Sequence, residues 1–315
     1  MGSDMVLGFG GIVREALIIF CKNGKLMASF TFLSLTLYSI LYLFNFFSTR
    51  SLITKWIYNL SFLLLTTSNS PEYTNILIGL NKDIRMFVSI EWTFLLMSSI
   101  SSFFFSTATI LASSITHAGK PLSLKELFSM TARSLKRPFV TLVYVTLFGV
   151  GYIFLALVTL LPLMVTSGDP FVLKALFIVL SILTAALYAY LAIIWTLALV
   201  ISILEENYGI EAHGKAAKIV KGRVLHGFLV NLLITVLTYI LFLGFVSSST
   251  RLAAVQIMIG LLTLNSIWLV RMFGLMAYTV LYYQCKKSHG EEVELQWSTE
   301  HSKIHTLPLL TENIP

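Results

Sequence analysis

Charged residues inside apolar stretches are the side chains of this sequence most suited to chemistry. Arg271 lies within the apolar stretch 253–283, about 18 Å before its end at the helical rise. A charge inside a bilayer is costly and usually pairs within the protein or marks a path for ions. Glu205 and Glu206 follow the apolar stretch 171–204 at a matching depth. We therefore expect a structural ion pair between Arg271 and either Glu205 or Glu206.

Glu91 is the second charge of this kind. It lies near the start of the apolar stretch 87–114, beside Trp92. One interpretation is a residue of the outer membrane interface, where aromatic residues gather. The other is a proton or cation site for transport. The stretch also carries a row of hydroxyl residues at spacing four, which either lets helices pack closely or lines a polar path: Ser98, Ser102 and Ser106.

No combination of residues typical of a catalytic centre is present in the sequence. It contains no His-Glu-x-x-His, no Gly-x-Ser-x-Gly, no phosphate-binding loop and no dinucleotide-binding glycine pattern. The six histidines are scattered outside the apolar stretches. We therefore expect no catalytic residue, no cofactor and no metal, and we interpret the protein as not an enzyme.

The amino-acid composition indicates the class of protein that holds these charged residues in place. Of 315 residues, 57% are hydrophobic and only 12% are charged, and the mean hydropathy is +0.84. Soluble domains carry about a quarter charged residues, so a water-exposed globule is excluded. Disorder needs low hydrophobicity, and a disulfide scaffold needs more than the two cysteines present. The remaining class is a polytopic membrane protein.

Six stretches approach or exceed the roughly 20 residues that a helix needs to cross a bilayer. They are 26–47, 87–114, 140–165, 171–204, 228–246 and 253–283. Short connections before the fourth and sixth stretches favour antiparallel neighbours. The predicted fold is all-α, with six transmembrane helices arranged as three hairpins. Residues 1–287 form one integral-membrane domain, and residues 288–315 form a flexible cytosolic tail.

The distribution of Lys and Arg predicts the orientation. Fifteen cations lie on the side of the two termini, and six lie on the opposite side. Because positive charges collect on the cytosolic side, both termini are predicted to be cytosolic. The first external connection, 48–86, runs against this trend because it holds four of the six. The location is an endomembrane or the plasma membrane.

A charge pattern recurs before each predicted hairpin. A glutamate is followed by a cation seven residues later and another after three more, which places the charges near one face of a helix. The three copies are Glu15, Lys22, Lys25; Glu126, Arg133, Lys136; and Glu211, Lys218, Lys221. We predict an interfacial amphipathic helix in each copy, with its two cations at the headgroups of acidic phospholipids. The alternative is three ordinary loops with the usual positive charge.

Two segments carry a family resemblance. One reads Leu204-Glu205-Glu206-Asn207-Tyr208-Gly209-Ile210-Glu211-Ala212, followed by Lys215 and Lys221-Gly222-Arg223, and the other reads Thr279-Val280-Leu281-Tyr282-Tyr283-Gln284-Cys285-Lys286. Together they resemble a family of plant six-pass membrane proteins with no established activity. More remotely, they are similar to the membrane domain fused to some bacterial glycerophosphodiester phosphodiesterases. The resemblance implies a multi-pass membrane fold. It implies no hydrolase activity, because the catalytic domain has no counterpart here.

The predicted function is that of a non-enzymatic multi-pass membrane protein acting through lipid and partner contacts. Its partners are the bilayer, acidic phospholipids and a cytosolic protein at the tail, where acidic residues and Trp297 occur together. The alternative is a small-solute or ion transporter using Glu91. A membrane-embedded lipid enzyme is disfavoured because no nucleophile and base are paired. Nucleic-acid binding is disfavoured because membrane flanks account for the net charge of +7.

Overall fold

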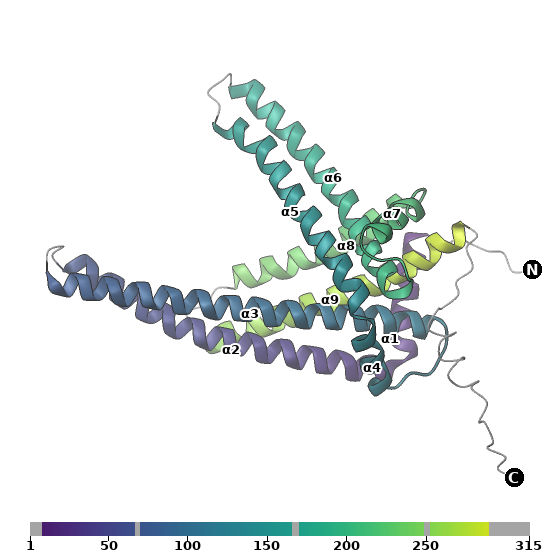
Figure 1. The fold of residues 1–315 in the computed structure, drawn as a ribbon, viewed down its shortest axis with the longest axis horizontal. Helices are drawn as coiled ribbons and strands as arrows, with labels where there is room; N and C mark the ends of the chain where they lie inside the picture. The colour runs from purple at the N-terminus through teal and green to yellow at the C-terminus, as the bar shows by residue number, and fades with distance from the viewer. Residues whose placement is uncertain (1–7, 67–69, 166–169, 249–252, 290–315) are drawn as a thin grey trace, which may run out of the picture. The chain divides into compact units, whose positions relative to one another are not determined.

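A computed structural model describes residues 8–66, 70–165, 170–248 and 253–289, and these residues are helical nearly throughout (Figure 1). The described helices are α1 (Phe9–Lys22), α2 (Gly24–Leu65), α3 (Pro71–His117), α4 (Leu124–Ser134), α5 (Lys136–Val165), α6 (Pro170–Leu204), α7 (Ile210–Ile219), α8 (Val224–Ser247) and α9 (Ala253–Ser288). The described residues contain no strand. The predicted all-α class is confirmed. The predicted tail, 288–315, begins at the last residue of α9, and its residues 290–315 lie outside the described residues.

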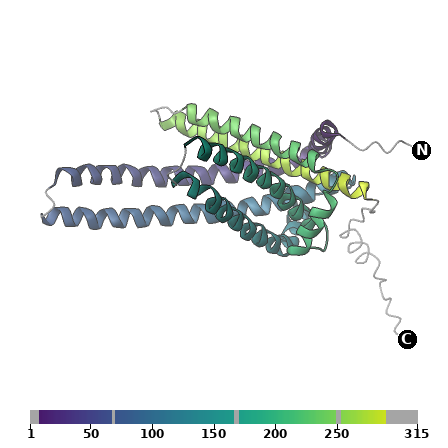
Figure 2. The same ribbon diagram turned by 90° about the horizontal axis from the view of Figure 1, so that it is seen from above.

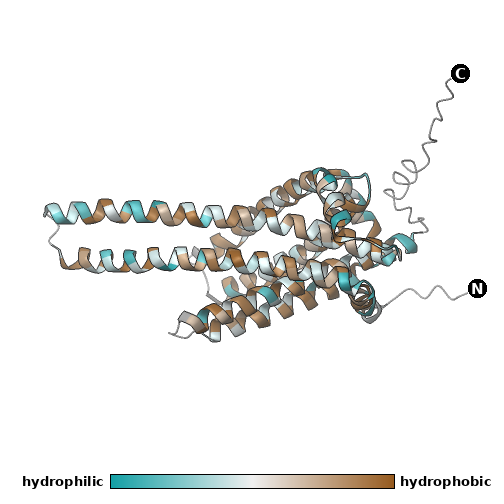
Figure 3. Ribbon diagram, turned by 90° about the horizontal axis from the view of Figure 1, so that it is seen from below, coloured by the Kyte–Doolittle hydropathy of each residue, from teal (hydrophilic) through white to brown (hydrophobic). Residues whose placement is uncertain are grey.

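Six of these helices are long and apolar enough to cross a membrane, as predicted: α2, α3, α5, α6, α8 and α9. Each contains one of the six predicted stretches. In the most apolar windows of α5 and α8 only 6% of the residues are buried within the protein. Hydrophobic residues, coloured brown, recur along all the long helices in Figure 3. So large an exposed apolar surface is unfavourable in water, and the structure is compatible with a multi-pass membrane protein.

Helices α2 and α3 continue well beyond the predicted stretches. They contain 42 and 47 residues, which correspond to lengths of about 63 and 70 Å, whereas a bilayer core is about 30 Å thick. The connection predicted over 48–86 is therefore helical over 48–65 and 71–86, and α2 continues past residue 47, where the predicted apolar stretch ends. Arg50 and Lys55 lower the local hydropathy, but neither residue type terminates a helix.

The chain divides into two compact units. Unit 1 comprises Met1–Gly24, Thr107–Thr235 and Met272–Pro315, and unit 2 comprises Lys25–Ser106 and Val236–Arg271. Within unit 1, helices α5 and α6 lie side by side, α7 packs on both of them, and α4 contacts α5 (Figure 1). Several ends of long helices and the short helices α1, α4 and α7 therefore belong to one unit.

Unit 2 contains most of α2 and α3, which run side by side in Figure 2 and are joined by polar side chains. Aromatic side chains of α2 and α9 also pack together within unit 2. The Trp268 indole donates a hydrogen bond to the Ser34 hydroxyl at 3.0 Å, and the rings of Tyr38 and Trp268 are 4.4 Å apart. Polar atoms are thus satisfied between helices rather than left in an apolar environment.

Two short helices of unit 1 begin at clear local signals. Helix α4 starts with a capping box, in which the Ser123 hydroxyl accepts from the Glu126 amide and the Glu126 carboxylate accepts from the Ser123 amide. Helix α7 starts after Gly209, which has a φ of 61° and lies against Tyr144 of α5. The Gly209 amide donates to the Thr141 hydroxyl at 2.9 Å. A larger residue at position 209 would be strained by the positive φ, and its side chain would also contact the tyrosine ring closely.

Candidate functional site

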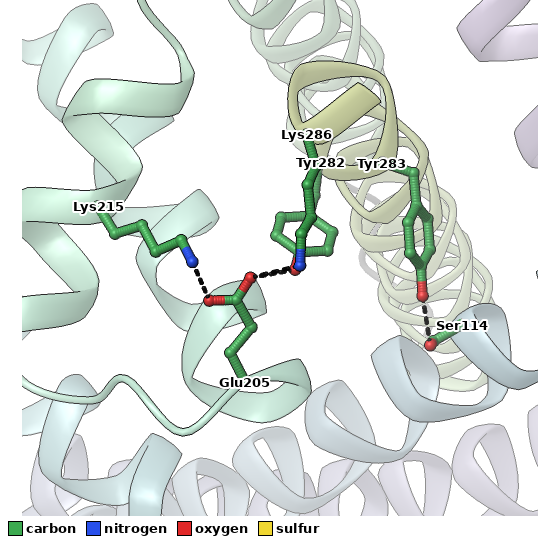
Figure 4. A network of polar contacts seen from close by, with 6 residues as sticks. All are labelled: Ser114, Glu205, Lys215, Tyr282, Tyr283 and Lys286. Carbon is green, nitrogen blue, oxygen red and sulfur yellow. Dashed lines mark hydrogen bonds and ion pairs between the residues drawn. The ribbon is translucent and has the colours of Figure 1, made fainter. Parts of the chain in front are cut away.

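A buried carboxylate gathers three elements of unit 1. Glu205 follows α6, and its side chain is only 11% exposed. Its Oε2 atom is 2.7 Å from the Lys215 ammonium of α7, and its Oε1 atom is 3.2 Å from the Lys286 ammonium of α9. The Tyr282 hydroxyl donates to the same Oε1 atom at 2.5 Å (Figure 4). We call these four residues the Glu205 cluster.

The surroundings of Glu205 favour its charged form. Burial by itself raises the pKa of this carboxyl. Hydrogen bonds from Lys215 and Tyr282, together with the positive charges of Lys286 and Lys215, outweigh burial and lower the pKa below its ordinary value of 4.5. The carboxylate is therefore ionised at neutral pH and fixes the ends of α6 and α9 to α7.

A second set of contacts joins α1 to the ends of α3 and α9. The Tyr283 and Ser114 hydroxyls are 2.6 Å apart, and the His117 ring stacks on Tyr283 at 4.7 Å between centroids. His117 Nδ1 is 3.2 Å from the Glu15 carboxylate of α1. Tyr283 follows Tyr282 in the chain, so the two sets are contiguous on α9, as Figure 4 shows for the tyrosines.

This arrangement is suited to holding helices together and to balancing buried charge. The Glu205 carboxylate is occupied by two ammonium groups and a phenol. Over the part of the chain that the structure describes, no three His, Cys, Asp or Glu residues group as a metal site. The geometry thus supports a structural and electrostatic role.

The predicted ion-pair residues lie in different units. The Arg271 guanidinium, in unit 2, lies 5.9 Å from the Trp268 ring centroid, whereas Glu205 belongs to unit 1 and Glu206 beside it is exposed. The Arg271 pair therefore stays a prediction. Sequence reasoning missed Lys215 and Lys286 as partners of Glu205. The spacing of Tyr282 and Lys286, one helical turn apart, was a usable signal.

The cations predicted to contact headgroups share one property. All six are exposed, although they come from three separate parts of the chain: Lys22, Lys25, Arg133, Lys136, Lys218 and Lys221. Two other cations are buried: Arg223, two residues after Lys221, and Lys286 of the Glu205 cluster. The predicted set is therefore open to contact from outside, whereas Arg223 and Lys286 are enclosed by the protein.

The three copies of the charge pattern differ in the contacts of their acids. Glu15 pairs with His117, and Glu126 closes the capping box of α4. Glu211 is exposed in the first turn of α7. What recurs in all three copies is therefore the pair of exposed cations, not a common function of the glutamate.

Glu91 lies in unit 2 and contacts helix α2. Its Oε1 atom accepts hydrogen bonds from the Asn45 amide at 3.2 Å and the Thr49 hydroxyl at 3.0 Å. Two turns earlier on α3, the buried Asp83 binds the Lys55 ammonium at 2.8 Å. Both carboxylates thus join α2 to α3, and Asp83 was not singled out from the sequence. A transport role of Glu91 stays a prediction.

Comparison with known families places this chain in one of them. Residues 4–307 match the family described as Domain of unknown function (DUF8558). The chain belongs to this family. No curated protein and no solved structure matches the DUF8558 chain. Membership carries no activity with it, and the expected resemblances to plant six-pass proteins and to the phosphodiesterase membrane domain stay expectations.

Proposed function

We propose that the protein is a non-enzymatic six-pass membrane protein that acts through contacts with acidic lipids and with partner proteins. The observation that supports this proposal most strongly is the exposure of all six cations at the starts of α2, α5 and α8 or the ends of the short helices before them. Each pair stands next to a helix able to cross a membrane. Cations there lie at headgroup depth, with each worth on the order of 1 kcal/mol near an anionic leaflet.

Helix α1 supplies the most complete case for an interfacial helix. Ile12, Ala16 and Ile19 are buried within unit 1. Leu17 and Ile18 on the remaining surface are 51% and 49% exposed, close to the exposed Lys22. Exposed apolar side chains beside cations are what a helix lying in the interface presents to lipid.

In the proposed architecture, three modules each combine a short helix with a hairpin of spans. The short helices α1, α4 and α7 precede α2, α5 and α8, in agreement with the order that the scheme requires. The excess of cations on the side of the termini places those short helices in the cytosol. The tail from residue 288 then faces a cytosolic partner.

Lipid selectivity in reconstituted membranes tests the proposal. Spin-labelled phosphatidylserine and phosphatidylcholine are compared for the fraction immobilised by the full chain in phosphatidylcholine vesicles. We expect a preference for phosphatidylserine of about fivefold at a cation site, which corresponds to about 1 kcal/mol. Replacing all six cations by Gln is expected to abolish the preference.

The matched control keeps the charge at the same six positions. It exchanges each Lys for Arg and converts Arg133 to Lys, and it should retain the preference for phosphatidylserine. An unchanged preference in the Gln variant would refute the proposal, because the exposed cations would then contribute nothing to lipid contact.

A further inference from the structure

Arg223 differs from the other cations of its region because it is buried. It lies in the turn between α7 and α8 and is 8% exposed, while Lys218 and Lys221 just before it are exposed. Gly222, with a φ of 95°, gives the turn the left-handed conformation that precedes Arg223. The flanking residues Gly222 and Leu225 are exposed, so the turn itself is reachable from outside.

The Arg223 guanidinium forms no ion pair in the structure with a carboxylate of residues 8–66, 70–165, 170–248 or 253–289. Its Nη1 atom is buried and has no hydrogen-bond partner among the residues that the structure describes. The Glu205 carboxylate is already shared by Lys215 and Lys286. Arg223 therefore has no share in that carboxylate, and a cation buried without an anion is unfavourable.

The start of α8 adds to this positive potential. Arg223 immediately precedes the 24-residue helix α8, and its carbonyl accepts the amides of His226 and Gly227. The dipole of a helix favours an anion at its N-terminus. His226, one turn along, has a buried Nδ1 atom that also lacks a partner in the described part of the chain. The residue before α8 and a residue of its first turn thus each carry a buried nitrogen without a partner in the described residues.

We propose that Arg223, with the start of α8 and His226, forms a specific binding site for a phosphate group. A guanidinium matches phosphate through paired hydrogen bonds, which a lysine cannot form. Helix α8 is a candidate membrane span, so its first turn lies at the depth of lipid phosphates. This site deepens the proposed function, on which it rests, by adding one selective lipid position to the general attraction of the exposed cations.

Short-chain phosphatidic acid is the probe for this site. Its binding to the full chain in neutral detergent is measured by tryptophan fluorescence, with short-chain phosphatidylcholine as the zwitterionic comparison. We expect phosphatidic acid to bind more tightly than phosphatidylcholine. Arg223→Gln should weaken phosphatidic acid binding by about tenfold or more, because a hydrogen-bonded charge pair is lost.

Three comparisons make the result specific. Lys221→Gln removes the same charge from an exposed neighbour and should weaken binding by no more than about fivefold. Arg223→Lys keeps the charge but loses the paired geometry and should bind with intermediate affinity; it also serves if Arg223→Gln does not fold. Inorganic phosphate that displaces the lipid at similar concentration would assign the site to soluble phosphates, whereas weak displacement assigns it to lipid.

The experiments can refute the phosphate site and the general lipid contact independently of each other. The six-cation Gln variant retains Arg223, so it should still bind phosphatidic acid selectively even where its phosphatidylserine preference is gone. Equal binding of phosphatidic acid by wild type, Arg223→Gln and Arg223→Lys would overturn the phosphate site. So would equal binding of phosphatidic acid and phosphatidylcholine by the wild type.

Discussion

Replacement of Glu205 by Gln tests the central contact of unit 1. The amide keeps an acceptor for the Tyr282 hydroxyl but removes the charge that compensates Lys286 and Lys215. Breaking a buried ion pair costs about 3–5 kcal/mol. The Lys215 side chain is 27% exposed and recovers some hydration. We therefore expect a loss near the lower limit, about 3 kcal/mol.

The free energy of unfolding is measured by denaturant titration of the full chain in mixed micelles. Glu206→Gln is the matched control, because this neighbour is exposed and undergoes the same change of charge. Its effect should remain within about 0.5 kcal/mol. Equal and small losses in the two variants would refute the assignment of Glu205 as a buried partner of two lysines.

The pH dependence of stability tests the same carboxylate independently. The pKa of Glu205 is lowered in the folded protein, so its contribution is fully present above the unfolded pKa of about 4.5 and is lost as pH falls through the folded value. Wild type should therefore lose more stability than Glu205→Gln on acidification below about pH 4.5. Parallel pH profiles would show that the folded pKa is not lowered.

Three further substitutions test the local geometry by the same unfolding measurement. Asp83→Asn should cost only about 1 kcal/mol, because its partner Lys55 is 61% exposed and hydrates readily; a loss as large as that of Glu205→Gln would contradict this. Ser123→Ala should cost about 1 kcal/mol through loss of the α4 cap, and no loss would argue against the capping box. Gly209→Ala should cost about 2 kcal/mol, since φ is positive and Tyr144 is close; a neutral result would place the strain elsewhere.

The membrane-length helices were predictable because their signal is local. A continuous apolar stretch fixes both helix and span, since a bilayer leaves no other way to satisfy the backbone. The same reasoning failed at the ends of α2 and α3. There the helix continues past charged residues, and its polar side chains are satisfied by the neighbouring helix, as in the contact of Lys55 with Asp83. A hydropathy profile shows that a residue is charged, but it does not show that a residue distant in sequence pairs with it.

The Glu205 cluster was predictable only in part for the same reason. The sequence marks Glu205 as an acid at the end of a span, and therefore as a residue in need of a cation. Lys286 lies 81 residues further along the chain, and its spacing from Tyr282 marks a shared helix face without identifying Glu205 as the partner. The packing of α7 and α9 near the end of α6 determines which lysines contact Glu205. The position of Glu205 predicts that it has a cationic partner, and the tertiary structure determines which lysine that is.

The repeated charge pattern shows how equal spacing can conceal unequal roles. Glu15 joins α1 to His117 of α3, whereas Glu126 closes the first turn of its own helix. Glu126 lies in the first turn of α4, whereas Glu15 lies in the middle of α1, so the same spacing to the cations occurs at different places in a helix. The cations face no such competing use within the protein, and in all three copies they are exposed. If the pattern is retained for lipid contact, charge-preserving changes at the cations should be tolerated together, while the three acids should respond differently to replacement.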